Sequence, residues 1–198
     1  NNAGSTINVT GTYGIGMFAD GAGSRAENYG TINLESAGEF RGAYGMYINN
    51  HATGYVGPSG VIKSGRYGSN TDKSDLIGIA VLNGATLENH GIIDIDARNS
   101  YGIYIRNGII KNYGTINISG TGSIGLRYKN ATDENGNPLN PADIQNAVNL
   151  GNGATVYRED PNINNNVGTS AGSTRISPTG VVTINGNIVS VHDLTSEI

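Results

Sequence analysis

The residues best suited to metal chemistry form one short stretch, Asp133-Glu134-Asn135-Gly136-Asn137. Carboxylate and amide oxygens at close spacing are ligands that Ca²⁺ prefers, so the stretch resembles part of a calcium-binding loop. Such a loop carries a bidentate Glu at its twelfth position, but the twelfth residue counted from Asp133 is Ile144. We therefore predict a solvated turn with no metal.

Acid/base chemistry would need paired carboxylates on one exposed surface. Asp94 and Asp96 alternate with isoleucines and are expected to point outward, in line with Asn33 and Asn117 of neighbouring repeats. A carboxylate flanked by amides is not an acid/base pair. The histidines also lack the sequence spacing of metal ligands; they are His51, His90 and His192. We therefore expect no enzyme activity, no catalytic residue and no cofactor.

The amino-acid composition narrows the classes of function that the chain could have. The 198 residues carry a net charge of −4 and no Cys, and only 14% are charged. An acidic chain without a basic stripe is not expected to bind nucleic acid. The chain shows no signal peptide, and the repeat described next reaches both of its ends. We therefore expect a segment of a longer protein.

Six stretches share one pattern, in which a turn residue, usually Gly, precedes alternating apolar and polar residues. They are 5–9, 30–34, 60–64, 91–95, 114–118 and 180–184. A second pattern, Gly followed by apolar, any and apolar residues, recurs at 13–17, 44–48, 77–81, 101–105 and 124–128. A third recurs at 25–28, 86–89 and 109–112. Repeats of this length indicate a solenoid.

Three strands per repeat, each pairing with its copy in the next repeat, predict an all-β fold. It is a right-handed single-stranded parallel β-helix, with about six coils of three short strands each, spanning 1–198 as a single unit. Period-two alternation predicts three inward columns. The first contains Ile7, Ile32, Ile62, Ile93, Ile116 and Val182, with Val9, Leu34, Ile95, Ile118 and Ile184 beside them. The second contains Ile15, Met46, Ile79, Ile103 and Leu126, and the third contains Ala26, Val56, Leu87, Ile110 and Val156.

The corners of the coils repeat an Asn, any residue and a Gly. The predicted corner residues are Asn28, Gly30, Asn89, Gly91, Asn112 and Gly114. Gly and Asn adopt positive φ at the lowest cost, so we expect that conformation there. Asn side chains stacked one coil apart are expected to bond along the column. The residues after them, Tyr29, His90 and Tyr113, predict an exterior aromatic column.

Two insertions interrupt the fifth coil, at 129–150 and 158–178. In the first, Pro141 precedes apolar residues at 144, 147 and 148, which predicts a short helix. Loops on a rigid scaffold are common recognition sites. The candidate partner-binding residues are therefore Asp133, Glu134, Asn135, Asn137, Asn140, Arg158, Glu159 and Asp160.

The run from Asn112 to Asn117, followed by Ser-any-Gly-aliphatic at 123–126, resembles the passenger repeats of bacterial type V autotransporters. The large fusobacterial outer-membrane adhesins are the most similar in style. The resemblance covers residues 4–128, and 151–191 more loosely. It implies an exported parent that is anchored in the outer membrane by a C-terminal barrel absent here, and it supplies no fixed binding residues.

The sequence thus favours a segment of a surface-exposed adhesin shaft. The insertions, or exposed rings such as Tyr29, Tyr104 and Tyr113, would contact a protein or glycan on host cells or partner bacteria. Two alternatives stay open: a polysaccharide-degrading or tailspike-like β-helix enzyme, and a spacer that binds nothing.

Overall fold

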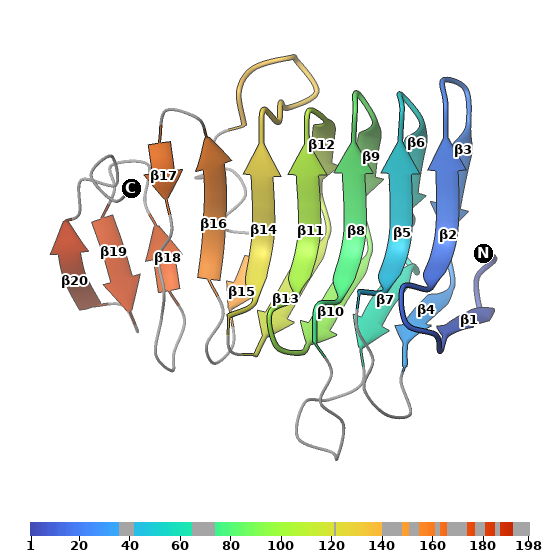
Figure 1. The fold of residues 1–198 in the computed structure, drawn as a ribbon, viewed down its shortest axis with the longest axis horizontal. Coiled ribbons are helices and arrows are strands. Elements are labelled where there is room, and N and C mark those ends of the chain that lie inside the picture. Colours follow the sequence, from blue (N-terminus) through green and yellow to red (C-terminus); the bar gives the residue numbers. More distant parts are fainter. Residues whose placement is uncertain are drawn as a thin grey trace.

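The computed structural model describes residues 1–35, 42–64, 74–120 and 122–139, and beyond them the backbone of the strands named below. Each of the first four coils contributes one short strand to each of three parallel sheets, and the coils stack along one axis (Figure 1). The fold is a right-handed parallel β-helix, which confirms the predicted fold class. No helix long and apolar enough to cross a membrane occurs in these parts of the chain.

The three sheets take their strands from successive coils in strict order. The first sheet contains β1 (Thr6–Val9), β4 (Thr31–Leu34), β7 (Val61–Ser64), β10 (Ile92–Asp96), β13 (Thr115–Ser119) and β15 (Val148–Leu150). The second contains β2 (Ile15–Asp20), β5 (Tyr44–Asn49), β8 (Ile77–Leu82), β11 (Tyr101–Arg106), β14 (Ile124–Lys129) and β16 (Thr155–Asp160), with β17 (Ile163–Asn165) antiparallel at its edge. The third contains β3 (Arg25–Asn28), β6 (Thr53–Val56), β9 (Thr86–Asn89) and β12 (Ile109–Asn112).

The first inward column is confirmed through its first five coils. Ile32 pairs with Ile62 and Ile93 pairs with Ile116, and all four side chains are completely buried. At the sixth position, however, Val148 pairs with Ile116. The prediction that Val182 and Ile184 continue this column is wrong. They lie on β19 (Val181–Ile184), in an antiparallel sheet with β18 (Thr174–Ile176) and β20 (Asn187–Val191).

The second column differs from prediction at its first residue, and the third differs at two residues, Val56 and Val156. Met17, not Ile15, pairs with Met46, and Ile15 is 43% exposed on the outer face. In the third sheet, Gly54 pairs with Ala26, so Val56 lies two residues further on, paired with Asn28. Val156 belongs to β16 in the second sheet, because β16 pairs with β14.

A glycine in each of β2, β5, β8, β11 and β14 lets the chain bend inward against the first sheet. A Cβ atom on Gly102 would lie 2.6 Å from the carbonyl oxygen of Gly125 in the next coil and 2.8 Å from Ile116 Cγ2. The bend places two consecutive residues, Gly102 and Ile103, in the interior. As a result Tyr101 and Tyr104, three residues apart, both face outward, where strict alternation would oppose them.

The two predicted insertions are bounded differently in the structure. Val148–Leu150 is a strand of the first sheet in register with Ile116, so the 129–150 block ends in a regular coil strand. Arg158 to Asp160 complete strand β16, so the 158–178 block does not begin as a loop. The helix expected from Pro141 to Val148 falls mostly on residues outside the described part, and its last residue is in β15.

Candidate functional site

The outer surface of the third sheet carries a row of ring-bearing and charged side chains. Each of its strands buries its second residue, and β3, β6 and β9 also bury the fourth. The third residues, Glu27, Tyr55, Glu88 and Lys111, therefore fall into one outward column. Thr132 pairs with Ile109 one coil beyond β12, so Glu134 continues the same column. Residues from five successive coils therefore meet on one surface.

Four rings stack along this surface. The centroid of Tyr55 lies 5.6 Å from those of both Tyr29 and His90, and His90 lies 4.9 Å from Tyr113 at an interplanar angle of 26°. We call Tyr29, Tyr55, His90 and Tyr113 the aromatic ladder. The sequence predicted three of its members and missed Tyr55, whose alternation with inward Gly54 and Val56 was the available signal. Tyr55 and His90 are flanked on both sides. Of the two end rings, Tyr29 is half-buried and Tyr113 is 60% exposed, so Tyr113 is the open ring.

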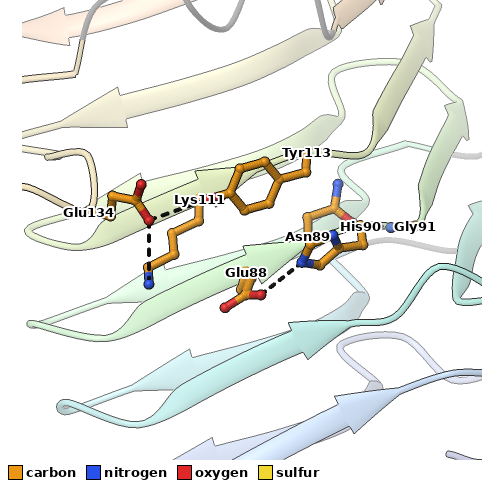
Figure 2. Close-up of polar contacts among 7 residues, drawn as sticks. All are labelled: Glu88, Asn89, His90, Gly91, Lys111, Tyr113 and Glu134. Atoms are coloured by element: carbon orange, nitrogen blue, oxygen red, sulfur yellow. Dashed lines mark hydrogen bonds and ion pairs between the residues drawn. The ribbon is translucent and has the colours of Figure 1, made fainter.

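Charged groups frame Tyr113 (Figure 2). Its hydroxyl donates to Glu134 Oε2 over 3.2 Å, and the Lys111 ammonium lies 3.6 Å from the same oxygen. One coil below, His90 Nε2 and Glu88 Oε1 are 2.8 Å apart. Burial, followed by the hydrogen bond to Glu134, raises the pKa of Tyr113 above its ordinary value. The phenol therefore stays protonated and remains a donor at neutral pH.

Beneath the ladder, buried asparagines fix the corner. Asn89 is completely buried; its Nδ2 donates to Asn112 Oδ1 over 2.7 Å, and its Oδ1 accepts from the Gly91 amide over 3.1 Å. This part of the expected asparagine column is confirmed. Asn28 instead bonds to Asn1, whose Nδ2 donates to Asn28 Oδ1 over 2.8 Å, because Val56 interrupts the column between Asn28 and Asn89.

The corner residues do not use positive φ, contrary to expectation. Positive φ occurs instead after the second-sheet strands, at Asn50, Asn83, Asn107 and Asn130. Glycine is required at Gly91 because an added Cβ would collide with the carbonyl oxygen of Gly60, and at Gly114 because it would collide with that of Gly91. Gly30 is confined in the same way by Asn2 and Ser5. Close approach of stacked backbones, not backbone conformation, selects glycine at these corners.

The acidic stretch forms the turn that the sequence predicted. Asp133 Oδ1 accepts from the amides of Asn135 (2.8 Å) and Asn137 (2.9 Å), and its Oδ2 accepts from Asn137 Nδ2 over 3.1 Å. These bonds, that of the Asn137 side chain first, lower the pKa of Asp133. The carboxylate of Asp133 therefore holds the turn together, and Glu134 is the residue of the turn that contacts the ladder.

The other candidate residues are not brought to this surface by any described contact. Asn140 lies outside the described residues. Arg158, Glu159 and Asp160 form the end of β16, paired with Asn165, Asn164 and Ile163 of β17. Among the described residues, no group of three or more His, Asp or Glu side chains is placed to hold a metal ion.

This geometry suits recognition of a polar surface ligand. Tyr113 offers an exposed ring with a polar tip, and Lys111 and Glu134 place a cation and an anion next to it. Amphipathic rings beside a few fixed polar groups are typical of binding surfaces. Lys111 and Glu88 had no signal in the sequence beyond their alternation with inward residues.

The comparisons with known proteins bear on the first coils. Residues 1–60 match the family model described as BigA third pectate lyase-like domain. No curated protein and no solved structure matches the chain. The matched residues include β1 to β6, so the match supports the fold and does not reach Lys111, Tyr113 or Glu134. The chain is thus a parallel β-helix whose first two coils are similar to a bacterial pectate lyase-like domain.

Proposed function

We propose that the chain is a non-enzymatic segment of a surface-exposed bacterial adhesin, which contacts a glycan or protein on host cells or partner bacteria. The observation that carries the proposal is Tyr113. Its ring is 60% exposed at the end of the aromatic ladder, where Lys111 and Glu134 fix polar groups beside it. The rigid stack of coils holds this group at a constant position without a cost in ordering on binding.

The resemblance of the repeats to autotransporter passengers supports export to the cell surface. The proposed binding residues differ from the sequence-based expectation in one respect. Recognition is centred on the third sheet where the turn at Asp133–Asn137 folds against it, because Glu134 contacts Tyr113 and Lys111 there.

Binding of the purified chain to intact host cells and partner bacteria tests the proposal. Tyr113→Ala should weaken binding by at least about tenfold, the usual effect of removing a central Tyr from an interface. Tyr13→Ala is the matched control, because Tyr13 is 74% exposed on the loop between β1 and β2. Equal binding by both variants would refute the site, and no binding by the unaltered chain would favour the spacer.

A polysaccharide-cleaving role is the second candidate, favoured by the match of residues 1–60 to a pectate lyase-like model. Incubation with an acidic polysaccharide separates it from adhesion. Release of new sugar ends by the purified chain would support an enzyme, whereas binding without cleavage supports the adhesin.

A further inference from the structure

The outer face of the second sheet carries different residue types from the outer faces of the first and third sheets. Outward positions of the first sheet are largely polar, including Asn33, Lys63 and Asp94, and those of the third are largely charged or ring-bearing. On the second sheet, β2, β5, β8, β11 and β14 lie side by side, with β16 next to β14, and no described segment crosses in front of these five strands (Figure 1). Three outward columns run across these five strands.

Two of these columns are almost entirely apolar or aromatic. One reads Ile15, Tyr44, Ile77, Tyr101, Ile124. The middle one reads Phe18, Tyr47, Ala80, Tyr104, Arg127. Phe18 is 59% exposed, and Ala80 is fully buried although it faces outward. Tyr and Arg are the residue types enriched at interface centres.

Charge is confined to the two ends of this face. The third column reads Asp20, Asn49, Leu82, Arg106, Lys129, so its acidic end is in the first coil and its basic end is in the fourth and fifth. Arg127 adds a cation at the same end, with its guanidinium 5.3 Å from the Tyr101 ring centroid. The acidic end of this face therefore attracts the basic end of the same face on a second copy of the chain.

We infer that this face binds a second copy of the chain. The two copies would be related by a two-fold axis that runs along the strands through Ala80. That axis places the first coil of one copy on the fifth coil of the other, so Asp20 meets Lys129 and Phe18 meets Arg127. Tyr44 then meets Tyr101, and the axis passes over Ala80, whose side chain is already buried within its own copy. A two-fold axis along the coil stack would instead place the Asp20 column on Ile15, so the charges select the first arrangement.

The size of the face sets the strength of the contact. Five strands spaced by about 4.8 Å, each six residues long at about 3.3 Å per residue, cover roughly 400 Å² per copy. That equals the largest apolar patches on ordinary monomers but is about half of the roughly 800 Å² per partner that stable complexes bury. The association is therefore weak and depends on concentration, and it is strengthened where many copies are held on one surface.

Sedimentation equilibrium of the purified chain, from about 1 µM to several hundred micromolar, tests the inference. We expect dimers at the upper concentrations and a dissociation constant at least about tenfold higher for Phe18→Lys. Asn33→Lys adds the same charge on the first sheet and should leave the constant unchanged. Circular dichroism of each variant checks that the β-structure is kept.

A charge exchange tests the orientation. Asp20→Lys and Lys129→Asp should each weaken the dimer. The double variant should restore it, because residue 20 of each copy faces residue 129 of the other copy across the axis. A monomer at every concentration would overturn the inference and assign the face to another partner. A dimer that is indifferent to Phe18→Lys, or a double variant weaker than both single ones, would overturn it as well.

Discussion

Replacing Asn89 by Val separates hydrogen bonding from packing at the third-sheet corner. Val cannot accept from the Gly91 amide or donate to Asn112 Oδ1, both of which Asn89 does in the structure. A buried amide left without a partner costs about 1–3 kcal/mol, and the lost side-chain bond has a net value of about 1 kcal/mol. Burying two methyl groups offsets about 1.5 kcal/mol. We expect a loss of about 1–2 kcal/mol in the free energy of unfolding.

The second coil makes this a sharp test, because Val56 already occupies the equivalent position. Val is tolerated there since the corner is built differently: the Gly60 amide donates to the Gly57 carbonyl over 2.8 Å and needs no side chain. Urea unfolding followed by circular dichroism measures the loss. Asn33→Val is the control, because its bond to Asn8 is exposed, and should cost less than about 0.5 kcal/mol. Equal losses would show that the buried amide adds nothing and would refute the reasoning.

Three further predictions use the same unfolding assay or NMR. Gly91→Ala forces a Cβ against the Gly60 carbonyl and should lower the free energy of unfolding by about 2–3 kcal/mol. Gly23 has positive φ but open space around it, so Gly23→Ala should lower it by about 1 kcal/mol. The reverse order would contradict the close-approach argument. Ile116→Lys places an ion in the core and should cost several kcal/mol, while Asn117→Lys on the outer face should be mild; similar losses would contradict the inward assignment. The lowered pKa of Asp133 means that its turn is stabilised above pH 3.8 and loses this contribution as the pH falls through the lower folded value, so the Asn137 amide resonance should shift only in that acidic range.

The first sheet was the most predictable part of the chain because its strands obey strict alternation. A Gly or Ser precedes each of its first five strands, and a one-residue slip would expose Ile32 or Ile93, so the register has one solution. The second sheet breaks this rule at its glycines. Because Gly16 and its equivalents turn inward with the next residue, counting from Ile15 in the first coil assigns the wrong residue to the core.

Errors in the later coils have a different cause. Residues 180–184 carry the repeat's pattern, yet Val148–Leu150, with a much weaker pattern, occupies the sixth position of the first sheet. Pattern alone describes a strand that buries one face, and both parallel and antiparallel sheets need such strands. Which segment pairs with β13 depends on position along the chain, because residues 148–150 are nearer to β13 in the sequence than residues 181–184 are.

The candidate site shows where prediction from one sequence stops. The asparagine corner and three rings of the aromatic ladder followed from repetition, since each coil supplies the same residue type at the same place. Lys111 and Tyr55 were not predicted, and Glu134 was predicted from its place in the insertion and not from the repeat. Residues that repeat from coil to coil stabilise the stacking of the coils. Residues that differ from coil to coil, such as Lys111 after Glu88, give the surface of a solenoid its specific chemistry.

The two proposed surfaces therefore lie on different sheets of the same β-helix. The aromatic ladder belongs to the third sheet and the apolar face to the second, so a ligand at Tyr113 and a second copy at Tyr47 do not compete for the same strands. Phe18→Lys should abolish self-association while leaving a soluble ligand's affinity at Tyr113 unchanged. Binding to a dense cell surface should still fall, because paired copies bind it with higher avidity than single ones. A Phe18→Lys chain that binds cells as strongly as the unaltered chain would show that self-association makes no contribution to adhesion.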